Sequence, residues 1–203
     1  MKVIYSESEF DGRASVVALG MFDGVHIGHQ ALIRSAADLA RAMDAQSVVC
    51  TFDRHPMSVI CPGRAPVPLL SLQENLKKFE QLGADWVLVK AFTPEFAAMP
   101  PEEYLRELTR DLRVRAIVAG ENYSFGAGGR GDASLIRELS AELGYRAEIV
   151  PPVMDGDVMC SSTWIRSLLA RGEDEWAQRL LRIEEPENML GWDADRKRRR
   201  LAR

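Results

Sequence analysis

The chain has 203 residues, of which 46% are hydrophobic and 28% are charged, and its formal net charge is −4. These values are typical of one globular domain and exclude general disorder. No apolar run approaches the roughly 20 residues that a membrane helix requires, and the first residues lack the apolar stretch of a signal peptide. The three cysteines, Cys50, Cys61 and Cys160, are far apart, which disfavours a disulfide framework and a zinc site. We therefore expect a cytoplasmic protein.

The charge is distributed unevenly along the chain. Residues 191–203 carry six basic and two acidic side chains, so the rest of the chain is more acidic than the net charge indicates. Nucleic-acid binding depends on basic side chains that neutralise phosphates, so we expect neither nucleic acid nor a membrane as a partner. We expect one domain over residues 1–185 and a basic, solvated C-terminal tail over residues 186–203.

Segments rich in β-branched residues alternate along the chain with segments of helical period. The predicted strands are residues 16–19, 48–52, 86–89, 116–119 and 146–150. The predicted helices are residues 29–43, 72–82, 100–112 and 133–143, with further helical segments after residue 162. This order predicts right-handed βαβ units and therefore an α/β fold. We expect a Rossmann-like, doubly wound, mostly parallel sheet of about five strands, with C-terminal helices.

Local signals mark several element ends. Ser71 and Glu74 have the spacing of a capping box, and Gly83 is placed to close the helix that follows. Asp132 is a candidate N-cap for the predicted helix at residues 133–143. The proline-rich residues 62–68 are expected to form a loop, because proline lacks the backbone donor that a sheet requires.

Two of the three histidines lie between the first predicted strand and its helix, in the sequence GMFDGVHIGH. In open α/β sheets this is where ligands bind, because the free N–H groups and dipole of a helix N-terminus attract phosphate. Gly20, Gly24 and Gly28 allow a ligand close to the backbone, and His26 and His29 can hold phosphoryl oxygens. The alternatives are ordinary turn glycines and a metal half-site, for which no third ligand is evident.

Four further segments follow in order: TFDRHP at residues 51–56, FTPEF at 92–96, GENYSFG at 120–126 and SSTWIR at 161–166. Together with the histidine segment, they resemble the FMN adenylyltransferase module of prokaryotic FAD synthetases, which belong to the nucleotidylyltransferase superfamily with an HxGH signature. The resemblance covers about residues 15–185. It implies transfer of the adenylyl group of ATP to FMN, giving FAD and pyrophosphate.

The resemblance also implies three sets of site residues. The implied catalytic residues are His26, His29, Asn122 and Arg166. The implied ATP-binding residues are Gly20, Phe22, Gly24, Gly28, Ser162, Thr163 and Arg166. The implied flavin-binding residues are Phe52, His55, Asn122 and Phe125. No metal site on the protein is expected, and Mg²⁺ would enter with ATP.

The residue types suit these roles, although each also has an ordinary structural explanation. Ser162 or Thr163 would cap a helix, and Arg166, one turn on, would direct its guanidinium group toward the same end. Asn122 can donate and accept hydrogen bonds toward either substrate, but asparagine is also common in turns. Phe125 can stack on a flavin or adenine ring or belong to the core.

The chain departs from the bifunctional members of the family in two respects. Those proteins continue into a β-barrel riboflavin kinase module, for which no strands are evident after Leu181, so we expect no riboflavin kinase activity and a separate kinase that supplies FMN. Arg54 stands where the family often has proline. Two other functions stay open: a nucleotidylyltransferase for another phosphorylated acceptor, and a non-catalytic sensor of flavin or nucleotide.

Overall fold

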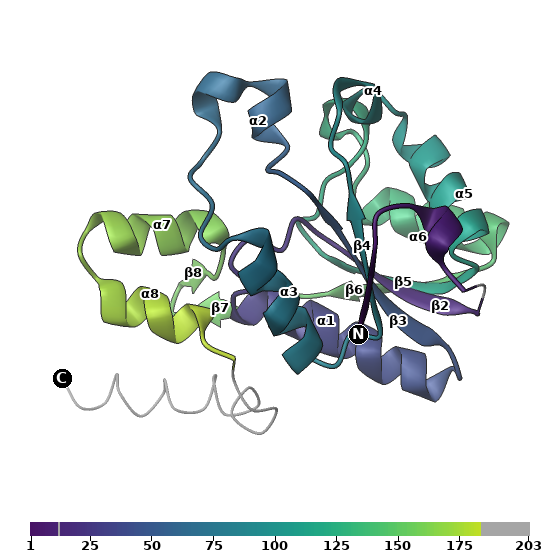
Figure 1. The fold of residues 1–203 in the computed structure, drawn as a ribbon, viewed down its shortest axis with the longest axis horizontal. Coiled ribbons are helices and arrows are strands. Elements are labelled where there is room, and N and C mark those ends of the chain that lie inside the picture. The colour runs from purple at the N-terminus through teal and green to yellow at the C-terminus, as the bar shows by residue number, and fades with distance from the viewer. Residues whose placement is uncertain (12, 184–203) are drawn as a thin grey trace.

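The computed structural model describes residues 1–11 and 13–183 and is built around a parallel sheet (Figure 1). Its six strands, from edge to edge, are β1 (Lys2–Ile4), β4 (Trp86–Lys90), β3 (Gln46–Phe52), β2 (Ser15–Leu19), β5 (Val114–Gly120) and β6 (Arg146–Val150). The predicted α/β fold with a doubly wound, mostly parallel sheet is confirmed. The predicted tail, residues 186–203, lies outside the described residues.

The central strands explain why the sequence reads as apolar runs. All five residues of β2 are buried, and Val17 pairs in register with Val48 of β3 and Ile117 of β5. Strands of a parallel sheet are covered by helices on both faces and therefore lack a polar alternation. The sixth strand, β1, was not predicted because three residues are too few to carry a periodic signal.

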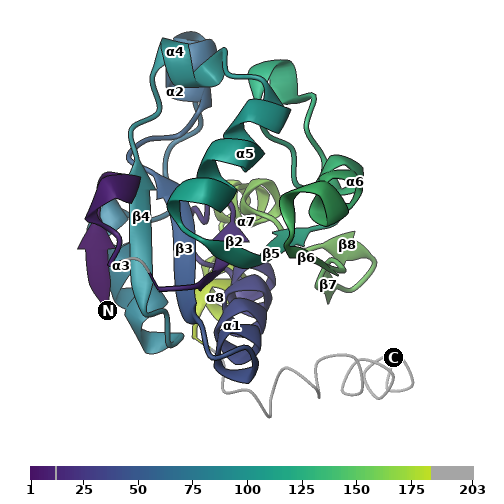
Figure 2. The same ribbon diagram turned by 90° about the vertical axis from the view of Figure 1, so that its right-hand side faces the viewer.

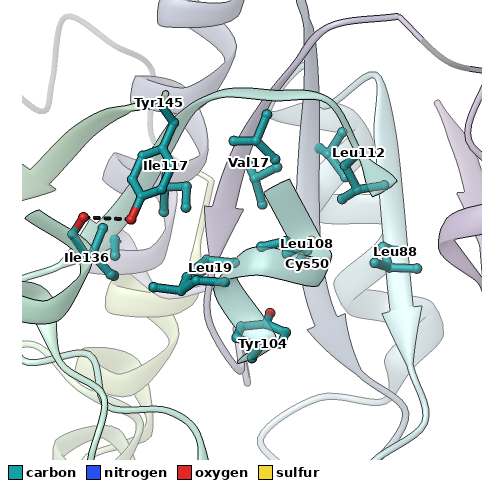
Figure 3. Close-up of a cluster of buried hydrophobic side chains, with 14 of the residues drawn as sticks. Val17, Leu19, Cys50, Leu88, Tyr104, Leu108, Leu112, Ile117, Ile136 and Tyr145 are labelled. Atoms are coloured by element: carbon teal, nitrogen blue, oxygen red, sulfur yellow. Dashed lines mark hydrogen bonds between the residues drawn. The ribbon is translucent and has the colours of Figure 1, made fainter. Parts of the chain in front are cut away.

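Helices cover both faces of the sheet (Figure 2). The longer ones are α1 (Ile27–Ala42), α3 (Leu72–Gln81), α5 (Pro101–Asp111) and α6 (Ala133–Leu143). Ile33 of α1 and Phe79 of α3 belong to one core cluster. Leu108 of α5 and Ile136 of α6 belong to the other, in which the Tyr145 hydroxyl donates to the Ile136 carbonyl at 2.6 Å (Figure 3).

The C-terminal part packs beside the start of α1. It contains a short hairpin of β7 (Met154–Asp155) and β8 (Val158–Met159), followed by α7 (Ser162–Ala170) and α8 (Asp174–Leu181). Ile27 of α1 shares a third core cluster with Ile165 and Leu168 of α7 and Leu180 of α8. The predicted C-terminal helices are confirmed, and they anchor the N-terminal end of α1.

Two predicted helix caps are confirmed, and the structure adds short helices that were not predicted. Ser71 forms the capping box of α3, and Asp132 caps α6. The short helices α2 (Met57–Ile60) and α4 (Pro94–Ala97) were not predicted, since four residues show no helical period. The proline-rich loop contains the 3₁₀ helix η2 (Pro62–Arg64). No helix among residues 1–11 and 13–183 is long and apolar enough to cross a membrane.

Candidate active site

A cavity of about 520 Å³ opens at the carboxyl ends of the parallel strands. Its wall includes Gly20 after β2, Phe52 at the end of β3 and Gly120 at the end of β5, together with the first turn of α1. From β2 the sheet extends on one side to β3 and β4 and on the other to β5 and β6. Such a switch point is where open α/β sheets bind ligands.

Helix α1 begins with His26 as its N-cap. Nδ1 of His26 accepts a hydrogen bond from the backbone N–H of His29 at 3.4 Å. The predicted helix start at His29 is therefore wrong by two residues, because a histidine takes the place of the usual Ser, Thr, Asp or Asn cap. Since Nδ1 acts as the acceptor, the neutral His26 ring carries its proton on Nε2 and can donate from there.

The two histidine rings stack on each other, with His26 buried and His29 half-buried. Their centroids are 3.6 Å apart and their planes differ by 22°. Burial, assisted by Lys78, lowers the pKa of His26 to about 3. Burial and the neighbouring His26 lower the pKa of His29 well below its ordinary value. Both rings are therefore neutral at pH 7 in the free protein, and a bound polyanion would favour their protonation.

Two glycines allow this arrangement. A Cβ at Gly28 would lie 3.2 Å from ring atoms of His26, and a Cβ at Gly20 would lie 2.9 Å from the ring of Phe22. Phe22 in turn packs edge-on against His29, with ring centroids 5.3 Å apart. A side chain at either glycine would therefore displace a ring that shapes residues 20–29, which we call the histidine loop.

Arg166 reaches the histidine loop through Asp23. Its guanidinium group pairs with the Asp23 carboxylate, and its Nε donates to the carbonyl of Val67 at 2.8 Å. The same carboxylate accepts from the Leu69 N–H at 2.9 Å, and the Ser162 hydroxyl donates to the Asp23 carbonyl at 3.0 Å. Asp23 thus joins the loop to two distant segments. It was not predicted as a site residue, although a carboxylate inside the histidine motif was an available signal.

Helix α7 begins one residue away from the predicted caps. Ser161 is the N-cap, and its hydroxyl accepts from the Trp164 N–H at 3.1 Å. The expectation that Ser162 or Thr163 caps the helix is therefore wrong. The physical reason is backbone conformation, because the capping residue has extended dihedral angles, which Ser161 has and the helical residues after it lack. Ser162 lines the cavity, whereas Thr163 is exposed outside it.

The other part of the cavity has an aromatic wall. It consists of Phe52, Phe92, Phe96, Tyr104, Tyr123 and Phe125. Phe52 packs edge-on against Phe92, with ring centroids 5.1 Å apart. Tyr123 and Phe125 are stacked, with centroids 5.5 Å apart. Only Phe52 and Phe125 were predicted as site residues. The other four come from segments that the chain brings together only on folding, although the FTPEF segment contains two of them.

The remaining predicted residues divide into two groups. Asn122 lines the cavity, is exposed, and donates from its amide to the Met159 sulfur at 3.1 Å. Phe22, Gly24, His55, Thr163 and Arg166 do not form part of the cavity wall. Nδ1 of His55 accepts from the Met57 N–H at 3.1 Å, which orients its ring at the start of α2. Burial and Arg166 lower the pKa of His55.

The site offers a divalent cation few protein ligands. Within the part of the chain that the structure describes, no group of three or more His, Cys, Asp or Glu side chains could hold a metal ion. The Asp23 carboxylate, inside the histidine loop, is already paired with Arg166. A divalent cation at this site would therefore take most of its ligands from a bound polyphosphate.

Comparisons with known proteins show the family to which this sequence is similar. The sequence pattern of the FAD synthetase family matches residues 9–164. The chain belongs to the FAD synthetase family. The family resemblance predicted from the ordered motifs is thus confirmed.

Relatives in this family differ in length. A bifunctional riboflavin kinase/FMN adenylyltransferase from Escherichia coli K12 is 31% identical over 179 residues, which cover 88% of this chain and 57% of that protein. A Geobacillus thermodenitrificans relative, provisionally named for the same two activities, is 36% identical over 95% of this chain and 98% of its own length. A solved structure titled macrolide-efflux protein, from Streptococcus pneumoniae, matches with a TM-score of 0.76 and 30% identity over 89% of this chain and 60% of that one.

Proposed function

We propose that this chain transfers the adenylyl group of MgATP to FMN, giving FAD and pyrophosphate. The observation that carries the proposal is one cavity with two different parts. The paired histidines at the N-terminus of α1 suit a polyphosphate, and the aromatic wall suits a flavin ring. Family membership supports the same reaction.

In this reaction an oxygen of the FMN phosphate attacks the α-phosphorus of ATP, and the bond from that phosphorus to the bridging oxygen breaks as pyrophosphate leaves. The protein supplies position and charge stabilisation rather than a covalent intermediate. Nε2–H of His26 and the free N–H groups of the first α1 turn are donors that suit the extra negative charge of the transition state. His29 stacks on His26, and we assign it with His26 to the stabilisation of transition-state charge.

Arg166 and Asn122 are assigned further roles in binding the substrates. We assign Arg166 to the β- and γ-phosphates, which requires its guanidinium group to share or exchange its pairing with Asp23. We assign Asn122, whose amide faces the cavity beside the aromatic wall, to hydrogen bonding with the substrates. Mg²⁺ enters as part of MgATP, where it neutralises phosphate charge.

The test is FAD formation by the purified chain with FMN and MgATP, followed by chromatography against an enzyme-free control. Catalytic FAD and equimolar pyrophosphate are the expected products. Parallel reactions contain nicotinamide mononucleotide or glycerol 3-phosphate in place of FMN, and one contains EDTA, which should stop the reaction until Mg²⁺ is restored. ATP binding without FAD, or with faster transfer to another acceptor, would contradict the proposal.

We further propose that FMN is supplied by a riboflavin kinase, the second activity for which the bifunctional relatives are named. The test is to add riboflavin in place of FMN, with and without a purified riboflavin kinase. FAD that forms from riboflavin only when the kinase is added is the expected result. The cytoplasmic location expected from the sequence stays a prediction.

A further inference from the structure

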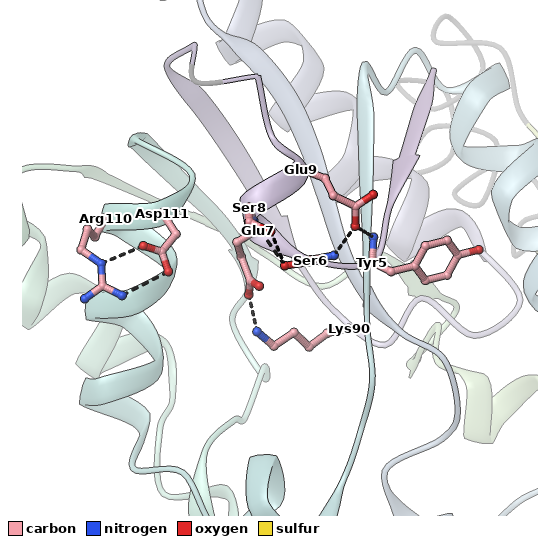
Figure 4. Close-up of polar contacts among 8 residues, drawn as sticks. All are labelled: Tyr5, Ser6, Glu7, Ser8, Glu9, Lys90, Arg110 and Asp111. Atoms are coloured by element: carbon pink, nitrogen blue, oxygen red, sulfur yellow. Dashed lines mark hydrogen bonds and ion pairs between the residues drawn. The ribbon is translucent and has the colours of Figure 1, made fainter.

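Figure 4 shows an ion pair between the side chains of Glu7 and Lys90. Lys90 is the last residue of β4, and Glu7 opens the 3₁₀ helix η1 (Glu7–Glu9), which follows β1. The side chains of Lys90 and Glu7 are only 27% and 18% exposed. Loss of one partner from a partly buried pair leaves an uncompensated charge, so its effect exceeds that of a fully exposed pair.

Local hydrogen bonds fix the backbone that presents Glu7 (Figure 4). The Glu9 carboxylate accepts from the N–H groups of Tyr5 and Ser6 at 3.0 and 2.9 Å. Ser6 and Glu9 together form a capping box around η1. Because both ends of this turn are held, the Glu7 carboxylate is directed at Lys90 by a short and ordered segment.

Lys90 contacts the aromatic wall through Phe96. Its Nζ lies 5.6 Å from the centroid of the Phe96 ring, within cation–π range. The Phe96 ring lies 5.7 Å from that of Phe52 and 5.6 Å from that of Tyr104. Phe96 belongs to the four-residue helix α4, which is too short to be stable alone. The position of its ring therefore depends on its contacts.

The charge of Glu7 also acts on Cys50 and on Tyr104, which belongs to the wall. Burial and Glu7 raise the pKa of the Cys50 thiol, and Lys90 opposes this effect. Burial raises the pKa of the Tyr104 hydroxyl well above its ordinary value, with smaller contributions from neighbours that include Glu7. These effects agree with the contact geometry in placing the ion pair next to the wall.

We propose that Glu7 and Lys90 are positioning residues that hold Phe96 in the aromatic wall and thereby set the affinity for FMN. The identity of the ligand rests on the proposed function, whereas the positioning of Phe96 does not. The histidine loop lies at the other part of the cavity, so the ion pair affects FMN binding and leaves ATP binding unchanged.

The first measurement follows Phe96 without any ligand. The protein is labelled with 4-fluorophenylalanine, and the Phe96 signal in the ¹⁹F NMR spectrum is assigned from a Phe96→Leu variant. Glu7→Gln and Lys90→Met should each shift or broaden this signal. The matched control is Lys2→Met, which removes a cation–π contact of 4.5 Å with Trp86 at the opposite end of β4. This control should leave the Phe96 signal unchanged.

The second measurement is FMN affinity from quenching of flavin fluorescence, combined with the KM for ATP. Each single variant should raise the Kd for FMN by about tenfold, a coupling typical of residues in contact, and leave the KM for ATP within about twofold. The double variant Glu7→Gln/Lys90→Met should bind FMN more tightly than either single variant, because no unpaired charge remains and methionine still packs against the Phe96 ring.

The outcomes separate this inference from the proposed function. An unchanged Phe96 signal in both single variants, or additive losses in the double variant, would overturn the positioning role. A wild-type chain that binds no FMN, with a Phe96 signal that still responds to Glu7→Gln, would refute the proposed function and the FMN affinity claim while supporting the positioning of Phe96. Circular dichroism verifies folding, and Lys90→Met carries the test if the Glu7 variant does not fold.

Discussion

The two parts of the cavity are built in different ways. The histidine loop is a local structure, in which His26, Gly28 and His29 lie within four residues and are organised by the first turn of α1. The aromatic wall is assembled from six residues between positions 52 and 125, which come from the end of β3, the loops after β4 and β5, and the helices α4 and α5. A short motif can therefore specify the part that we propose binds phosphate, whereas the part that we propose binds flavin depends on the packing of the whole sheet.

This difference predicts how each part responds to substitution. In the histidine loop, small changes alter ring positions against a rigid helix start, so effects should fall on turnover. In the aromatic wall, many rings share the contact with a ligand, so each substitution should have a smaller effect that falls on FMN binding. Four predictions test this contrast, starting with the largest expected effect.

His29→Ala should lower kcat by about 100-fold or more, the effect typical of removing one group that stabilises transition-state charge. The KM for ATP should change by less than about threefold, because the helix N-terminus and the other phosphate contacts remain. Steady-state kinetics with FMN and MgATP measure both values, and Lys77→Ala on the exposed surface of α3 is the control. Equal losses in kcat and ATP affinity would argue against a transition-state role.

Gly28→Ala should lower kcat by about tenfold without loss of stability. The added Cβ would press on the His26 ring at 3.2 Å, whereas alanine is a better helix former than glycine. Gly63→Ala is a matched control, because a Cβ at Gly63 would meet no atom within 4 Å. Kinetics and thermal unfolding of both variants separate the effects. Full activity in Gly28→Ala would show that the position of the His26 ring does not matter.

Phe52→Leu should raise the KM for FMN by about fivefold and leave the KM for ATP unchanged. The substitution removes one ring from the wall, together with its edge-on contact with Phe92 and its tilted contact with Phe96. Flavin fluorescence titration and ATP kinetics measure the two effects. A larger loss in kcat than in FMN affinity would contradict the proposed division of the cavity.

Acidification should weaken folding through the buried histidines. Because burial lowers the folded-state pKa of His26 from 6.5 to about 3, the folded chain binds fewer protons than the unfolded chain between these values. The contribution of neutral His26 to the free energy of unfolding is therefore complete above about pH 6.5 and is lost as the pH falls toward 3. Urea unfolding should show a loss of about 1 kcal/mol from His26 between about pH 7 and about pH 5.5, and a further loss from His29 in the same direction. His29→Asn should reduce this dependence, and a variant whose stability depends on pH as steeply as that of wild type would refute the assignment.

The sequence predicted most of the sheet because its central strands are continuous apolar runs, such as residues 16–19 and 48–52. It also located the histidine loop, whose residues are adjacent in the chain. It could not predict that Phe96 and Tyr104 meet Phe52 and Phe125, because such contacts depend on strand order and on short elements without a periodic signal. The geometry of Arg166 was missed for a similar reason, since its partner lies more than one hundred residues earlier.

The parallel pairing of β1 with β4 has a consequence for the order of folding. Residues 2–4 pair with residues 86–88, so β1 has no partner during synthesis until more than eighty further residues have been added. The unit of β2, α1 and β3 involves much shorter separations and can form while the chain is still growing. The N-terminal strand, and Glu7 directly after it, should therefore be among the last parts of the molecule to reach their native positions.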